Sequence, residues 1–246
     1  MDKIKPLLKF FSVFKEIYEP STCLCIDEMV APFAGRFKYL TYNPLKPHKW
    51  GIRIIGLADS TNGYCLSLIP QLGEETYKYL GVKDLDELIV QWMKNFASEG
   101  ASLYVDNYYC HFLLAEKLLR EGFNVTGTYR LTRKSVPSII QDAVVKKKVV
   151  SKNKKEKITT TTTTTCTKSK AEEGKPIRYF KSTHGIYAVK WKAKKEVNVL
   201  TTNHSLESES QDTARNREIT RPHAINEYIK YMRGIDRLNQ RVHYIR

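Results

Sequence analysis

The sequence predicts a mixed α/β domain that is interrupted by a low-complexity insertion in its second half. Between residues 23 and 129, short apolar runs of strand length alternate with segments whose apolar residues recur at helical spacing. Such an alternation is typical of a mixed sheet flanked by helices. Residues 138–175 then become rich in lysine and threonine, after which strand and helix patterns return.

The first half of the chain supplies most of the expected sheet. A helix is expected over 6–17 and ends at Pro20 and Ser21. The sequence Thr61-Asn-Gly63 predicts a tight β-hairpin turn. The other expected elements are strands at 23–26, 52–59, 64–69, 102–105 and 123–129, and helices at 83–98 and 111–121 that end at Gly100 and Gly122.

The second half divides at the insertion. Residues 146–157 hold seven lysines and residues 159–165 are all threonine, so neither stretch can bury a core, and we expect a largely disordered insertion at 138–175. Beyond it we expect a hairpin at 187–191 and 197–202, a loop at 203–218 and a helix at 222–240. The predicted organisation is a first part of the core at 1–137, the insertion at 138–175, and the remaining strands and last helix at 176–246.

Composition points to a polyanionic partner. The 41 Lys and Arg residues outnumber the 26 Asp and Glu residues, which gives a formal net charge of +15. Nucleic acid is the partner that such an excess favours, although a basic disordered loop explains part of it. The five cysteines form no CxxC pair and are interpreted as ordinary thiols in a reducing compartment, and no apolar segment is long enough to cross a bilayer.

Three aspartates stand out by their positions. Asp27 and Asp106 each end a short apolar run that reads as a strand. Asp236 continues a stripe of Ile225, Ile229 and Met232 at helical spacing, with Asn239 one turn beyond it. The simpler alternatives stay open: the first two acids suit turns or helix caps, and Asp236 suits an exposed position or an ion pair with Arg233 or Arg237.

Two strand-end acids and one helical acid can meet at one edge of a sheet. Carboxylate oxygens are the ligands that Mg²⁺ prefers, and Mg²⁺ leaves positions open for phosphates. The three aspartates therefore form a candidate metal site, in which two ions would act on the attacking and leaving oxygens of a phosphodiester.

An ordered series of motifs resembles the piggyBac-type transposase family. The first stretches are Ile26-Asp-Glu-Met-Val-Ala-Pro-Phe-Ala-Gly-Arg36 and Tyr42-Asn-Pro-Leu-Lys-Pro-His-Lys-Trp-Gly-Ile52, and Val105-Asp-Asn-Tyr-Tyr109 is similar to the second acidic block. The later ones are Gly127-Thr-Tyr-Arg130 with Arg133, Lys134 and Pro137, then Lys190-Trp191 with Val197–Thr201, then Tyr228, Tyr231-Met232, Gly234-Ile-Asp236 and Gln240. The series covers about 27–240, which is most of the chain.

This resemblance implies an RNase H-like fold with a catalytic triad at Asp27, Asp106 and Asp236. It implies Mg²⁺ (or Mn²⁺), with two ions, Asn239 being a further ligand position, and DNA strand cleavage and transfer at TTAA sites. It also implies a DNA partner, a nuclear location and a possible homodimer. In that reading the basic residues that contact DNA are Arg36, Lys38, Lys46, Lys49, Arg130, Arg133 and Lys134. A solvated basic surface is the alternative for these side chains.

The chain departs from the family pattern at three places. Asn239 stands where the family has a second helical acid, Ala193 replaces the acid of its WKD motif, and the chain ends at Arg246 before the family's C-terminal region. Two functions therefore compete. One is a transposase-derived catalytic domain, and the other is a domesticated or decayed non-catalytic protein that binds DNA or another partner.

Overall fold

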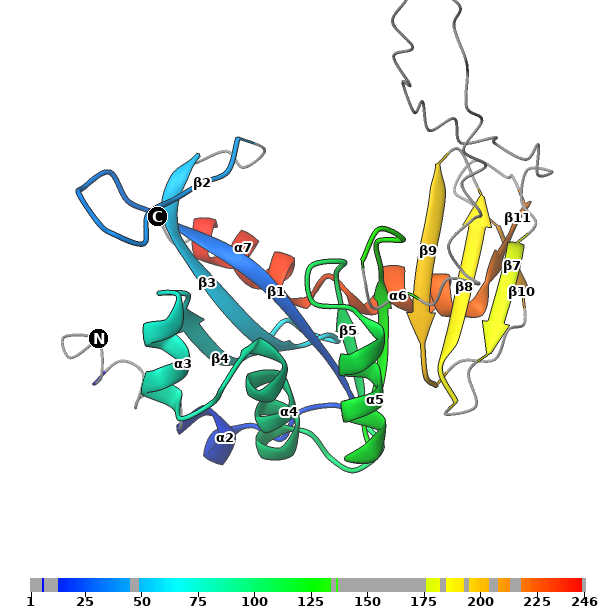
Figure 1. The fold of residues 1–246 in the computed structure, drawn as a ribbon, viewed down its shortest axis with the longest axis horizontal. Helices are drawn as coiled ribbons and strands as arrows, with labels where there is room; N and C mark the ends of the chain where they lie inside the picture. The colour runs from blue at the N-terminus through cyan, green and yellow to red at the C-terminus, as the bar shows by residue number, and fades with distance from the viewer. Residues whose placement is uncertain are drawn as a thin grey trace, which may run out of the picture.

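The computed structural model describes residues 6, 13–44, 49–133, 136, 176–181, 185–192, 195–203, 208–212 and 218–244, and this part of the chain is built on a nine-stranded sheet (Figure 1). The strand order is β2-β3-β1-β5-β6-β9-β8-β7, with β4 paired to β3. The strands are β1 (Cys23–Pro32), β2 (Thr41–Tyr42), β3 (Trp50–Asp59), β4 (Cys65–Pro70), β5 (Ser102–Val105), β6 (Asn124–Thr128), β7 (Pro176–Lys181), β8 (Tyr187–Lys192) and β9 (Glu196–Thr201).

The first five long strands lie in the order β4-β3-β1-β5-β6. Strand β3 is antiparallel to both β4 and β1, whereas β1, β5 and β6 run parallel to one another. The predicted hairpin turn joins β3 to β4, and Gly63 takes the positive φ of 73° that the turn requires. The central strands are therefore a mixed sheet, as the sequence predicted.

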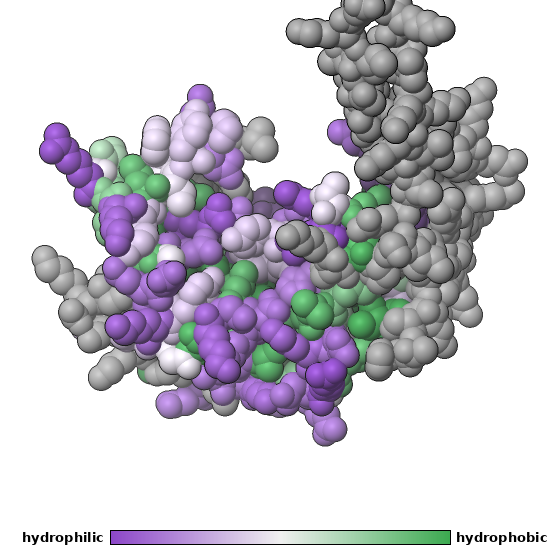
Figure 2. Space-filling view, in the orientation of Figure 1, coloured by the Kyte–Doolittle hydropathy of each residue, from purple (hydrophilic) through white to green (hydrophobic). Residues whose placement is uncertain are grey.

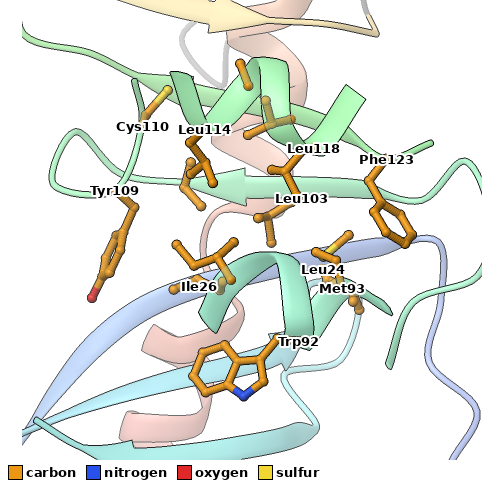
Figure 3. Packing of buried hydrophobic residues seen from close by; sticks show 14 of the residues in the cluster. Leu24, Ile26, Trp92, Met93, Leu103, Tyr109, Cys110, Leu114, Leu118 and Phe123 are labelled. Carbon is orange, nitrogen blue, oxygen red and sulfur yellow. The ribbon is translucent and has the colours of Figure 1, made fainter. Parts of the chain in front are cut away.

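Helices α4 (Leu85–Phe96) and α5 (Phe112–Arg120) cover one face of this sheet (Figure 1). Their buried apolar residues pack against Leu24, Ile26 and Leu103, which point to that face (Figure 3). Asp84 caps α4 by accepting a hydrogen bond from the Glu87 backbone N–H. This face carries the larger of the two main hydrophobic clusters.

Helices α6 (His223–Tyr231) and α7 (Gly234–Tyr244) lie on the opposite face, behind the sheet in Figure 1. The second cluster fills the space beneath them and consists of Cys25, Met29, Ala58, Tyr104 and Ile235. Side chains alternate along a strand. The apolar residues of β1 are therefore divided between the two faces.

The C-terminal strands extend the sheet beyond β6. Strand β9 pairs with β6, and β8 and β7 follow it outwards. A separate hairpin is formed by β10 (Ser208–Asp212) and β11 (Glu218–Pro222). Trp191, Val199, Ala224 and Ile225 form a third small cluster that joins α6 to this extension.

Several expected elements need correction. The expected loop at 203–218 contains β10, and helix α3 (Glu74–Leu80) and strand β7 were not expected at all. The single helix expected over 222–240 is two helices that separate at Met232 and Arg233. Of the helix expected over 6–17, α2 (Phe14–Ile17) is described, and the predicted insertion at 138–175 lies outside the described residues.

Two further sequence predictions concern the cysteines and the absence of a membrane-spanning segment. Cys23, Cys25, Cys65 and Cys110 are free thiols, and Cys23 and Cys25 share one face of β1, as predicted. Burial raises the pKa of Cys25 to about 11, so this thiol stays protonated near neutral pH. Among the described helices, none has the length and apolar character needed to cross a membrane.

Candidate active site

Asp27 and Asp106 lie side by side because the strands that carry them are paired in register. Ile26 is the partner of Val105 in the parallel pair of β1 and β5. Asp27 follows Ile26 and Asp106 follows Val105, so the two acids are neighbours across this strand pair. Cys25 and Tyr104 belong to the cluster beneath α7, and each acid follows one of these residues by two positions. The alternation of side chains therefore directs both acids towards the face that carries α6 and α7.

The start of α7 is fixed against the same strands by close backbone contacts. A Cβ at Gly234 would lie 2.4 Å from Cys25 Sγ and 3.0 Å from the Asp59 carbonyl oxygen, so a larger residue does not fit there. Arg237 donates to the carbonyl oxygens of Ser60 and Thr61, at 3.2 and 2.6 Å. The β3–β4 hairpin thus holds the first turn of α7, which contains Asp236, beside β1.

Asp27 lies within electrostatic reach of both other acids. Burial, together with the negative charges of Asp106 and Asp236, raises the pKa of Asp27 from 3.8 to about 7. The backbone N–H of Glu28 donates to Asp27 Oδ1 at 2.7 Å and opposes this rise. The charge of Asp236 reaches Asp27 although Asp236 lies on a different element more than 200 residues along the chain.

The expected apolar stripe leading to Asp236 is wrong. Ile225 is buried in α6, but Ile229 is 41% exposed, and Ile235 is the apolar residue of α7 that is buried against the sheet. The break between the helices changes the direction of the side chains, so Asp236 is exposed rather than desolvated. Asp236 stands in the first turn of α7, where the helix dipole favours a negative charge.

The residues fit a hard divalent ion by their chemistry. Asp27, Asp106 and Asp236 offer only oxygen ligands, and a cation among them would relieve the repulsion that raises the pKa of Asp27. Among the residues that the structure describes, no three His, Cys, Asp or Glu side chains are gathered closely enough to form a metal cluster. Asn239 lines an apolar groove of about 230 Å³ between α7 and β1 and is half-buried there.

Arg133 and Arg130 hold the loop that follows Asp106. Arg133 donates to the carbonyl oxygens of Asn107 and Tyr108, at 2.8 and 2.6 Å, and to that of Cys110 at 3.4 Å. Arg130 Nε donates to Asn107 Oδ1 at 3.0 Å. Asp106 itself accepts a hydrogen bond from the Tyr108 N–H at its Oδ1. The two arginines therefore fix the backbone from which the second acid projects.

Comparisons with known proteins give the family of this chain and a solved example of its fold. The family model described as Transposase IS4 matches residues 1–246, the whole chain. The chain belongs to this transposase family. A solved structure with a similar fold is the "Cryo-EM structure of piggyBac transposase synaptic complex with hairpin DNA (SNHP)", with a TM-score of 0.67 and 22% sequence identity. The similarity covers 98% of this chain and 47% of that chain, so this transposase-family chain spans less than half of the piggyBac chain.

At that level of identity the likeness shows the fold. It confirms the expected RNase H-like mixed sheet, and the recognition of a piggyBac-type transposase agrees with both comparisons.

The basic residues predicted for DNA binding lie, where the structure describes them, in two regions of the fold. Arg36, Lys38 and Lys49 are exposed on the segment that leads from β1 through β2 to β3. Lys46 and Lys134 lie outside the described residues. The structure thus separates an exposed basic group near β2 from the two arginines that bind the loop after Asp106.

Sequence reasoning missed the supports of the site. Gly234 was noted only as part of a motif, although its lack of a side chain lets α7 approach Cys25. Arg237 was considered as an ion-pair partner of Asp236, but it binds carbonyl oxygens of the hairpin instead. A glycine two residues before the acid was the available signal, since glycine commonly marks a close backbone approach.

Proposed function

We propose that this domain catalyses metal-dependent cleavage and transfer of DNA strands, with Asp27, Asp106 and Asp236 as the metal ligands. The observation that carries the proposal is the placement of Asp27 and Asp106 side by side, with Asp236 within electrostatic reach of Asp27. Asp27 lies within β1 and Asp106 directly follows the parallel strand β5, so both acids stand next to the Ile26–Val105 pair, and the charge of Asp236 acts on Asp27. Membership of a transposase family supports phosphodiester chemistry at such a site.

The acids and the arginines of the site would have different roles in metal binding. Asp27 and Asp106 are held by strand backbone and would form the rigid part of a site for Mg²⁺ (or Mn²⁺), with two ions expected. Asp236 is exposed at the start of α7 and would complete the site, with Asn239 as a neutral oxygen ligand one turn later. When bound, the ions would activate the attacking oxygen and stabilise the leaving one. Arg133 and Arg130 would keep the loop behind Asp106 in place.

DNA is the substrate that the charge of the chain favours. The net charge of +15 suits a polyanion, and the piggyBac structure with the similar fold is a complex with hairpin DNA. Arg36, Lys38 and Lys49 are exposed and would contact phosphates, as would Lys46 and Lys134. A nuclear location and a homodimer belong to the same proposal.

The test is cleavage of labelled DNA with and without Mg²⁺ or Mn²⁺. We expect the wild type to cut only with metal, and Asp106→Ala and Asp236→Asn to lose at least about a hundredfold in rate, because each removes a ligand charge. Glu99→Ala, which changes an exposed acid just before β5, is the matched control and should retain the wild-type rate. Equal cleavage by wild type and Asp106→Ala would overturn the proposal.

Two observations favour the alternative of a non-catalytic DNA-binding protein. Asn239 brings no charge to the site, and the described acids are not gathered into a metal cluster. A chain of this kind would bind DNA with an affinity that falls steeply with salt, because phosphate contacts release counterions. Salt-dependent binding without any metal-dependent cleavage would support this second function over the first.

A further inference from the structure

Three aromatic side chains form a row across the free end of the sheet. Tyr42 of β2 is the register partner of Trp50 in β3, and their ring centroids are 4.8 Å apart. On the other edge of β3, the Phe33 N–H donates to the Trp50 carbonyl oxygen at 3.4 Å, directly after the Pro32–Gly51 pair. Residues that lie opposite each other on antiparallel strands share a face. Phe33, Trp50 and Tyr42 are therefore neighbours on one face, and we name them the aromatic row.

The aromatic row is open to solvent. Phe33 is 41% exposed, and Tyr42 and Trp50 are each 53% exposed, whereas the other two tryptophans of the chain, Trp92 and Trp191, are buried. In Figure 2 this projecting part of the molecule, at the upper left, carries apolar and pale side chains next to strongly hydrophilic ones. Exposed aromatic groups gathered in one place indicate a binding surface, because folding alone would bury them.

The charged residues of the segment that carries the aromatic row, counting Lys, Arg, Asp and Glu, are all positive. Residues 29–58 contain no Asp or Glu but five Lys and Arg residues. Of these, Arg36, Lys38 and Lys49 are exposed close to the row in sequence. Within the described part of the chain, Lys38 is the one of the three that approaches a carboxylate, that of Glu75 at 3.9 Å. Two copies of the chain meeting at this surface would bring like charges together. A polyanion with flat apolar groups, in contrast, would complement both the rings and the cations.

The aromatic row faces the same way as the acids. Asp27 and Phe33 are six residues apart on one extended segment, and an even separation puts side chains on the same face. At about 3.3 Å per residue the separation along the strand is roughly 20 Å. Helix α7 runs over this face between them, since Leu238 and Val242 line the groove above Met29 and Pro32.

We propose that the aromatic row, with the exposed cations Arg36 and Lys49 close to it in the sequence, is a stacking site for unpaired bases of the DNA that the acids act on. The inference rests on the proposed function for the identity of the DNA. Aromatic rings stack on any base, because every base presents a flat π face, and adjacent cations follow the backbone. Paired bases are stacked on one another inside a duplex, so the row would distinguish DNA with an unpaired segment from blunt duplex.

The experiment measures the affinity of the full chain for a blunt duplex and for the same duplex with a single-stranded extension. We expect Trp50→Ala and Tyr42→Ala each to weaken binding of the extended duplex about tenfold while changing the blunt duplex less than about twofold. Trp50→Phe keeps a ring and should retain most of the affinity. Leu113→Ala is the matched control, because Leu113 is 57% exposed on α5 on the opposite face.

The outcomes separate this inference from the proposed function. Equal effects of Trp50→Ala on both DNAs, or none on either, would overturn the stacking site, even where metal-dependent cleavage is intact. Loss of self-association by Trp50→Ala in sedimentation, with the preference for the extension unchanged, would assign the row to contacts between copies and overturn it too. If the wild type binds neither DNA, both proposals fail. If Asp106→Ala cleaves DNA like the wild type while Trp50→Ala loses affinity for the extended duplex alone, the result supports the stacking site and overturns the catalytic proposal.

Discussion

Replacing Asp27 by asparagine should stabilise the metal-free protein above about pH 7. In the folded protein, burial and the charges of Asp106 and Asp236 raise the pKa of Asp27 to about 7, against 3.8 for an unperturbed aspartate. The folded state therefore binds the proton more tightly than the unfolded state does. Consequently the stability of the wild type falls as the pH rises from about 4 to about 7, and the full cost is present above pH 7. The amide of asparagine carries no charge and avoids this cost.

The magnitude follows from the difference between the two pKa values. A difference of about three pH units corresponds to roughly 4 kcal/mol at about 1.36 kcal/mol per unit. Asp27 retains some contact with solvent, which screens the repulsion, so we expect about 2 kcal/mol.

Urea unfolding of both proteins at pH 4, 6 and 8 in the presence of a chelator measures this difference. The variant and the wild type should be about equally stable near pH 4, and the gap should widen towards pH 8. Added Mg²⁺ should close the gap by stabilising the wild type alone, since the variant lacks the ligand charge. Glu99→Gln controls for a general change of charge. A gap that does not depend on pH, or an asparagine variant that is less stable at pH 8, would refute the reasoning.

Three further perturbations test the supports of the site. Arg133→Ala should weaken Mn²⁺ binding about tenfold by loosening the loop after Asp106, with partial recovery in Arg133→Lys; unchanged Mn²⁺ affinity would contradict the positioning role. Gly234→Ala should destabilise the fold by about 1–3 kcal/mol and slow DNA cleavage, because its Cβ would meet Cys25 Sγ; wild-type thermal stability and rate would argue against the close approach. Asp59→Asn should cost about 2 kcal/mol near neutral pH, because hydrogen bonds from Thr61, Ser21 and Tyr18 lower the pKa of this buried carboxylate despite the opposing effect of burial. That loss should shrink as the pH falls below about 4, and an equal loss at all pH values in urea unfolding would be inconsistent with it.

The central strands and helix α4 could be predicted from the sequence, because the apolar residues of the sequence pattern are the ones that are buried in the fold. The apolar runs before Asp27 and Asp106 are buried strands, and the helical spacing of 83–98 reflects the buried side of α4. The pairing of β1 with β5 then follows from the fold class, which puts the two acids together. Here each local signal matched the tertiary arrangement.

The elements that the sequence did not predict correctly are α3, β10 and the break between α6 and α7, and each has a physical cause. Helix α3 has no apolar stripe, because its one fully buried residue is Thr76, whose hydroxyl bonds the backbone of Leu72 and Pro70. Strand β10 is polar throughout, and its pairing with β11 comes from backbone hydrogen bonds that leave no mark in the sequence. The residues from Ile225 to Asn239 that suggested one long helix recur every three or four positions, but this series crosses the break at Met232. The regular spacing across the break was therefore accidental. The apolar stripe therefore does not continue to Asp236, although Asp236 still lies within electrostatic reach of Asp27.

The division of the apolar core between the two sheet faces separates folding from chemistry. The cluster under α4 and α5 is drawn almost entirely from residues before 137, whereas the acids, α7 and the aromatic row belong to the other face. Substitutions at Asp236 or Asn239 therefore leave the larger core untouched. A descendant of an active enzyme can lose its chemistry one carboxylate at a time and still be a folded protein, available for another role.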